Sequence, residues 1–118
     1  MHPVLREYPS ARFYDDRLKD GCSASERPSP AGILWPDWDN PFAFIPISGV
    51  EDEEQEGGSR SNPIEAARIY DLVQGLLLPG DVHPSEIGII TPYSGQVRAL
   101  SDICLLYTSD AADEWLRV

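Results

Sequence analysis

A short apolar run that leads directly into a helical pattern is the feature that most constrains this fold. Residues 87–90 read Ile-Gly-Ile-Ile, and Thr91 and Pro92 follow at once. Such a run is typical of a strand buried on both faces, as in parallel sheets. We expect Thr91 to cap a helix that has Pro92 at its first position and runs at least to Ile103. Open α/β sheets present residues to ligands at this kind of strand-to-helix switch.

A second strand and a long helix precede that switch. Residues 42–47 read Phe-Ala-Phe-Ile-Pro-Ile, an apolar strand in which Pro46 indicates an end or an edge position. Asn62 is predicted to cap a helix that has Pro63 at its first position, with Glu65 reaching back as the capping-box acid. The expected apolar face of this helix comprises Ile64, Ala66, Ala67, Ile69, Tyr70, Val73, Leu76 and Leu77. The order strand, helix, strand, helix predicts an α/β fold with a parallel strand pair and a right-handed crossover.

The N-terminal third is expected to hold less regular structure. Residues 1–21 should begin with a short helix or turn, and Pro9 should interrupt any long helix. Residues 22–40 are rich in proline and polar side chains and read as a loop that carries Trp35 and Trp38. These rings are suited either to packing the loop against a sheet, which is the commoner use, or to stacking on a base or on adenine.

Composition limits the function classes. At 118 residues the chain allows one domain at most, and 42% hydrophobic residues are enough for a core. It contains no apolar run of about 18 residues that would span a membrane, and it does not open with a signal-peptide pattern. A net charge of −11 argues against an autonomous nucleic-acid binder, although a motor can use a local basic groove formed with a neighbouring domain.

No metal site is expected. His2 and His83 lack partners at ligand spacing, and two cysteines do not support a zinc cluster or a disulfide framework. The acidic run 51–56 is interpreted as a solvated loop, which would repel a nucleic-acid backbone and should lie away from a binding groove.

The C-terminal tail differs from the rest of the chain. Cys104–Glu114 reads Cys-Leu-Leu-Tyr-Thr-Ser-Asp-Ala-Ala-Asp-Glu, which resembles the translation of adapter DNA from transposase-made sequencing libraries. The helical pattern of Val97, Leu100 and Ile103 stops where this segment starts. We therefore interpret residues 104–118 as a non-native tail and exclude them from fold reasoning. The alternative is a natural continuation of the helix.

Three blocks of sequence carry a family resemblance. They are Met1-His2-Pro3-Val4-Leu5, with Pro9-Ser10, Phe13-Tyr14 and Leu18; Asn62 with Glu65 and Ala66; and Ile87-Gly88-Ile89-Ile90-Thr91-Pro92-Tyr93 with Gln96. In this order and at this spacing they resemble the second motor domain of Upf-like superfamily 1 helicases. The resemblance covers residues 1–102, which is nearly all of the chain outside the tail.

The resemblance implies an ATP-driven motor that translocates along single-stranded RNA or DNA. Two RecA-like domains of such a protein, which have the P-loop NTPase type of fold, clamp ATP and Mg²⁺ between them. Residues 1–103 would be the N-terminal part of the second RecA-like domain, a three-layer α/β domain with a parallel sheet, and its partner would be the first RecA-like domain of the same parent chain. The family's phosphate-contacting arginine would lie before Met1 and its later arginine motif after Ile103. We therefore expect no catalytic residues, no bound cofactor and no ATP turnover in this fragment, and an intracellular location, cytoplasmic or nuclear, without a membrane partner.

The resemblance also implies site residues. His2 and Pro3 would lie at the edge of the nucleotide cleft as scaffold. Thr91, Pro92, Tyr93 and Gln96 would face the nucleic-acid strand, with Thr91 bonding a phosphate beside a helix N-terminus and Tyr93 packing on a sugar or base. The structural alternatives are a capping role for Thr91, a packed ring for Tyr93 and a solvated helix face for Gln96 and Arg98.

A second hypothesis comes from another functional class. The chain is then a free-standing α/β binding or adaptor module without catalytic activity. Such a module needs a complete sheet with covered edges, whereas the sequence predicts only two confident strands. The sequence does not distinguish RNA from DNA as the substrate.

Overall fold

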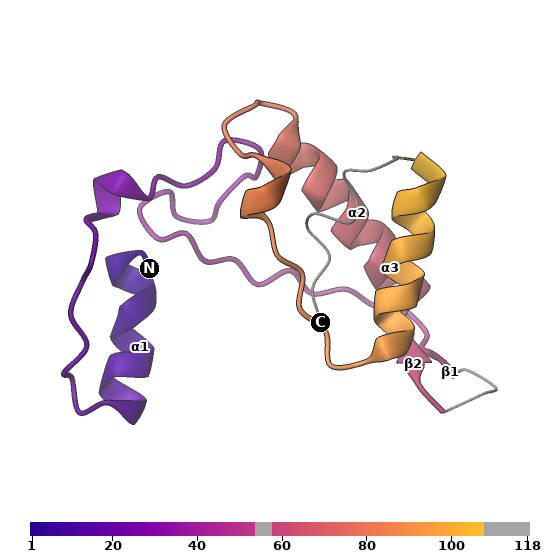
Figure 1. The fold of residues 1–118 in the computed structure, drawn as a ribbon, viewed down its shortest axis with the longest axis horizontal. Coiled ribbons are helices and arrows are strands. Elements are labelled where there is room, and N and C mark those ends of the chain that lie inside the picture. Colours follow the sequence, from indigo (N-terminus) through magenta and orange to yellow (C-terminus); the bar gives the residue numbers. More distant parts are fainter. Residues whose placement is uncertain (54–57, 108–118) are drawn as a thin grey trace. The chain divides into compact units, whose positions relative to one another are not determined.

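The computed structural model describes residues 1–53 and 58–107, with side chains described up to Ile103 (Figure 1). The chain divides into two compact units, Met1–Ile45 and Pro46–Val118. Each unit has its own internal structure. Within the described part, no helix is long and apolar enough to cross a bilayer.

The first unit is built around the helix α1, Pro3–Phe13. His2 caps it, because its Nδ1 accepts the Val4 N–H at 3.1 Å. The helix continues through Pro9, so the expectation that this proline would interrupt it is wrong. A proline removes one hydrogen bond from a helix, and other contacts here hold the last turn in place. The buried Ser10 supplies them, since its Oγ accepts the Leu18 N–H at 3.2 Å and ties the following segment to the helix.

The rest of this unit is loop, apart from the short 3₁₀ turn η1, Ala24–Glu26. Trp35 donates its Nε1–H to the carbonyl of Pro30 at 2.8 Å, so this indole ties the loop to itself. Trp38 is half exposed. The described residues of Met1–Ile45 contain no strand, so within this unit the rings have no sheet to pack against, and their packing on a sheet stays a prediction.

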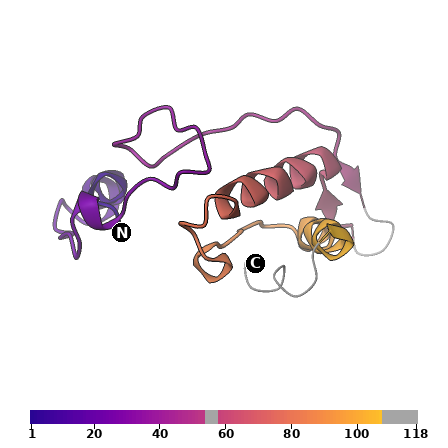
Figure 2. The same cartoon turned by 90° about the horizontal axis from the view of Figure 1, so that it is seen from above.

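The second unit consists of two helices and a small hairpin. The hairpin pairs β1, Asp52–Glu53, with β2, Arg60–Ser61, in antiparallel register. The helices are α2, Pro63–Leu77, and α3, Ser94–Tyr107, and the 3₁₀ turn η2, Pro84–Glu86, lies between them in the chain. Both views show α2 and α3 next to each other, with the hairpin at the end where both helices begin (Figures 1 and 2).

The core of this unit lies along one face of α2. Among its described residues, Ala66, Val73 and Leu100 are the buried apolar ones, and Ile69, Tyr70, Leu77, Ile87 and Ile89 pack around Val73. Ile64 and Ala67 are exposed, so the buried face is narrower than the sequence pattern predicted. The predicted start of α2 is confirmed, because the Oδ1 of Asn62 accepts the Glu65 N–H at 3.1 Å.

The expected parallel strand pair is not present in the described residues. No strand forms over residues 42–47, which cross the boundary between the two units at Pro46, a residue without an N–H to donate. Over residues 87–90 only Ile89 forms a β-bridge. Ile87 and Ile89 pack towards Val73, whereas the side chain of Ile90 is 86% exposed. This segment is therefore buried on one face and open on the other, and the expectation of burial on both faces is wrong.

Candidate nucleic-acid interface

All four residues predicted to face a nucleic-acid strand line one pocket of about 160 Å³ in the second unit. The pocket lies where the hairpin, the start of α2 and the start of α3 meet. Its lining residues are Glu51, Arg60, Ser61, Asn62, Glu65, Thr91, Pro92, Tyr93 and Gln96. Segments that are about 30 residues apart in the sequence thus converge at two helix N-termini, where the helix dipole favours negative charge.

The start of α3 differs from the sequence prediction by two residues. The carbonyl of Tyr93 accepts the N–H groups of Gln96 and Val97, so Tyr93 occupies the cap and the helix begins at Ser94. Thr91 forms a local turn, in which its Oγ1 accepts the Tyr93 N–H at 3.4 Å. The prediction that Thr91 caps the helix with Pro92 in first position is therefore wrong. Both residues precede the helix, and the ring of Tyr93 is 48% exposed, which also contradicts a packed ring.

Ser59, in the loop of the hairpin, caps the start of α3 in place of Thr91. The Oγ of Ser59 accepts the backbone N–H of Gly95 at 2.8 Å and the hydroxyl of Ser94 at 3.2 Å. The backbones come close together here, because a Cβ on Gly95 would lie 2.8 Å from the carbonyl oxygen of Arg60. The hairpin and α3 are therefore joined through backbone contact and one hydroxyl.

Gln96 joins the starts of α2 and α3. Its Oε1 accepts the backbone N–H of Asn62 at 2.7 Å, and its Nε2 donates to the Asn62 carbonyl at 3.3 Å. The side chain is only 4% exposed, so the interpretation of Gln96 as part of a solvated face is wrong. Glu65 was predicted to accept the backbone N–H of Asn62, the cap residue of α2. The side-chain amide oxygen of Gln96 accepts it instead. Arg98 is exposed and does not line the pocket.

The charges in the pocket are mixed. Arg60 donates from Nη1 to Oε2 of Glu51 at 3.2 Å, and both side chains are about half exposed. Glu65 adds a second carboxylate, so the lining holds one guanidinium and two acids. The acidic run was expected to lie away from the predicted site, yet its first residue, Glu51, lies in the pocket. Residues 54–57 of that run lie outside the described part of the chain.

Sequence reasoning missed Ser59 and Arg60. They follow the glycine-ended acidic run and lie three and two positions before Asn62, so the predicted cap at Asn62 was the available signal that residues near it would reach the same place. Their contact with Gly95 spans more than 30 positions and has no local pattern.

The two residues predicted at a nucleotide-cleft edge lie in the first unit. His2 is buried and lines a pocket of about 540 Å³ together with Ala24, Ser25, Arg27, Pro28, Ser29, Trp38 and Asp39. Pro3 is the first residue of α1 and does not line this pocket. Since Nδ1 of His2 already accepts from Val4, the ring acts as a helix cap in this unit. Among the described residues, no three His, Cys, Asp or Glu side chains gather as a metal site.

Removal of the Ser59 hydroxyl is predicted to weaken the start of α3. Ser59→Ala leaves the N–H of Gly95 without its acceptor, and we expect a loss of about 0.5–2 kcal/mol in the free energy of unfolding, as for a lost helix cap. Urea denaturation followed by far-UV circular dichroism measures this loss. Ser29→Ala, which removes a hydroxyl from the loop of the first unit, is the control. An equal loss in both variants would contradict the capping role.

Comparison with known proteins shows which family the chain resembles in sequence. Residues 1–113 match the model of a family described as "AAA domain". The chain is 42% identical over 98 residues to regulator of nonsense transcripts 1 of Caenorhabditis elegans and 41% identical over 97 residues to its Arabidopsis thaliana homolog. It is 38% identical over 97 residues to the ATP-dependent helicase upf1 of Schizosaccharomyces pombe. Each match covers 81% of this chain but only 9%, 8% and 10% of these relatives, respectively, so the chain spans about a tenth or less of their length.

Proposed function

The chain belongs to the AAA-domain family as part of an Upf-like superfamily 1 helicase, and from this we propose that its parent protein is an ATP-dependent motor that translocates along single-stranded RNA or DNA. Residues 1–103 contribute the N-terminal part of its second RecA-like domain, and residues 104–118 are a non-native tail. The convergence of the four predicted residues in one pocket is the observation that supports a nucleic-acid contact in this part of the motor.

In the parent, a parallel sheet of three-layer type would include residues 87–90. The described structure is compatible with this addition, because Ile87 and Ile89 pack towards α2 while Ile90 leaves an apolar face uncovered. Covering that side chain stabilises the domain by removing apolar surface from water. The first RecA-like domain of the same chain is the proposed neighbour, and an intracellular location, cytoplasmic or nuclear, goes with this function.

ATP and Mg²⁺ are the proposed cofactors of the parent, in which ATP hydrolysis drives movement along the strand. His2 would act at the edge of the nucleotide cleft as scaffold, because its Nδ1 is used by the Val4 N–H and its side chain is buried. Pro3 would hold the first turn of α1 beside it. The fragment itself is proposed to turn over no ATP.

The nucleic-acid contact is proposed at Thr91, Pro92 and Tyr93. The half-exposed ring of Tyr93 offers a stacking face that any base accepts. The hydroxyl of Thr91 and the N-terminus of α3 are suited to a phosphate. Gln96 serves this contact indirectly, because its amide is bonded to the backbone of Asn62.

Titration of the ¹⁵N-labelled 118-residue chain with single-stranded octauridylate and octathymidylate tests this proposal. We expect amide shifts centred on residues 91–95, and we expect Tyr93→Ala to weaken binding about fivefold or more, since one base stacked on an aromatic ring contributes about 1–3 kcal/mol. Tyr8→Ala, which removes an exposed tyrosine from α1, should leave the affinity unchanged. Shifts that avoid residues 91–95, or no shifts with either strand, would contradict the proposal. A preference for one strand identifies the natural substrate class.

A further inference from the structure

We propose that Arg60 is a phosphate-contacting residue of the nucleic-acid interface and that Glu51 occupies its guanidinium until a nucleic-acid phosphate displaces it. This inference rests on the proposed function and adds a residue and a form of regulation to the same site. It is carried by the position of the Arg60–Glu51 ion pair inside the pocket that also holds Thr91 and Tyr93.

The backbone of Arg60 is fixed at the start of α3. Arg60 pairs with Glu53 in the β1–β2 hairpin, and its carbonyl lies so close to Gly95 that a Cβ there would approach it to 2.8 Å. The neighbouring Ser59 accepts the Gly95 N–H, which prevents this part of β2 from moving away from α3. Arg60 therefore lines the pocket from a backbone that is held in place by the hairpin and α3.

The guanidinium itself is held weakly. Its contact with Glu51 joins Nη1 to Oε2 at 3.2 Å, and the side chains are 49% and 57% exposed. Ion pairs with this exposure contribute little to stability, because water solvates both charges. A guanidinium can bond a phosphate through two parallel N–H groups, whereas Glu51 makes one contact with it here. A phosphate that reaches Arg60 can therefore replace this single contact by two.

Arg60 is the only guanidinium or ammonium group among the described pocket residues, and two carboxylates accompany it. In this state the pocket carries a net negative charge, which opposes the approach of a nucleic-acid backbone. When a phosphate binds Arg60, the carboxylate of Glu51 moves into solvent. The guanidinium then has one negative neighbour fewer. Glu51 thereby lowers the affinity for a nucleic-acid strand, and Arg60 provides the attraction once a phosphate reaches it.

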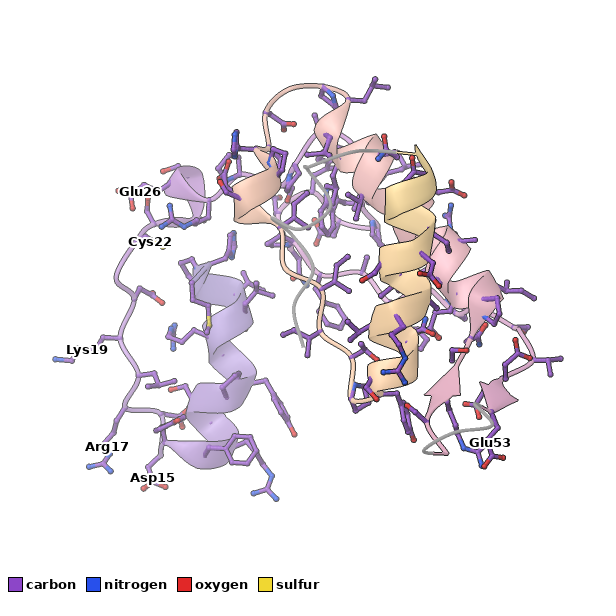
Figure 3. The ribbon with its side chains drawn as sticks, turned by 45° about the vertical axis from the view of Figure 1, so that its right-hand side comes forward. Asp15, Arg17, Lys19, Cys22, Glu26 and Glu53 are labelled. Carbon is purple, nitrogen blue, oxygen red and sulfur yellow. The ribbon has the colours of Figure 1, made fainter. Side chains whose placement is uncertain are left out.

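The test is a charge-matched set of variants of the full 118-residue chain, titrated with octauridylate. Glu51→Gln is expected to tighten binding about two- to fivefold, which is the range of an exposed ion pair. Arg60→Gln is expected to weaken binding and to reduce the slope of log Kd against log salt concentration by about 0.7, the value for one phosphate contact on a single strand. Glu53→Gln is the control, since Glu53 is an exposed acid of the same hairpin (Figure 3). It does not line the pocket.

The decisive comparison is the double variant. In the Arg60→Gln background, the effect of Glu51→Gln should fall to that of Glu53→Gln, because the guanidinium that Glu51 occupied is gone. Equal effects of Glu51→Gln and Glu53→Gln in the wild-type background, or a Glu51→Gln effect that persists without Arg60, would overturn the inference while leaving binding at residues 91–95 intact. Absence of binding by every variant, the wild type included, would overturn the proposed function together with it.

Discussion

Alanine at position 95 is expected to separate the start of α3 from the hairpin and to lower the free energy of unfolding by about 1–3 kcal/mol, as overpacking typically does. The new Cβ would lie 2.8 Å from the carbonyl oxygen of Arg60, and 3.1 Å from both its carbonyl carbon and the Oγ of Ser59. Two of these three atoms belong to the backbone, which cannot rotate away as a flexible side chain can. The hydrogen bond between Gly95 and Ser59 must therefore lengthen or break.

Gly21→Ala is the matched control for this prediction. A Cβ at Gly21 meets no atom within 4 Å, so the same substitution adds a methyl group there without a clash. Urea denaturation followed by circular dichroism should show a loss for Gly95→Ala and little change for Gly21→Ala. Amide shifts of Ser59 and Arg60 should change in the first variant only. An unchanged stability of Gly95→Ala would show that β2 and α3 are not packed as described.

The start of α2 could be predicted from the sequence, because it depends on neighbouring residues. Asn62, Pro63 and Glu65 lie within one turn, and the capping bond joins positions three apart. The start of α3 depends on residues far away in the chain. Ser59 provides the acceptor for Gly95 from a distance of 36 positions, so the local signal of Thr91 and Pro92 was outweighed.

The sheet was the part that sequence reasoning could not place. An apolar run such as 87–90 predicts an extended segment, but a strand also needs a neighbour whose backbone completes a hydrogen-bond ladder. Ile89 makes a bridge, and Ile90 remains exposed. The candidate site was predicted in a different way: its residues at 91–93 and 96 were identified from the family resemblance, while Arg60 and Glu51 became visible only when the hairpin and the helix starts were seen together.

Replacement of Gln96 by leucine is expected to lower the free energy of unfolding by about 1–3 kcal/mol and to weaken octauridylate binding. The variant puts an apolar side chain of similar size in place of the amide at a site that is 4% exposed, and it leaves the N–H and the carbonyl of Asn62 without their partners. Unsatisfied polar groups that are partly buried account for a loss of this size. Gln74→Leu, three turns along α2 from Asn62, is the matched control and should change both quantities little.

The NMR signals of the Gln96 side-chain amide distinguish a positioning role of this residue from direct contact with the nucleic acid. If Gln96 acts through Asn62, its Nε2 proton signals in the wild-type chain should stay in place during titration, while the amides of residues 91–95 shift. Gln96→Glu should retain part of the stability, because a carboxylate oxygen still accepts the Asn62 N–H, although it cannot donate to the Asn62 carbonyl. Large shifts of the Nε2 protons on binding would instead place Gln96 in contact with the strand. The bonds to Asn62 would then have to open for binding, which would make the start of α3 the moving part of this interface.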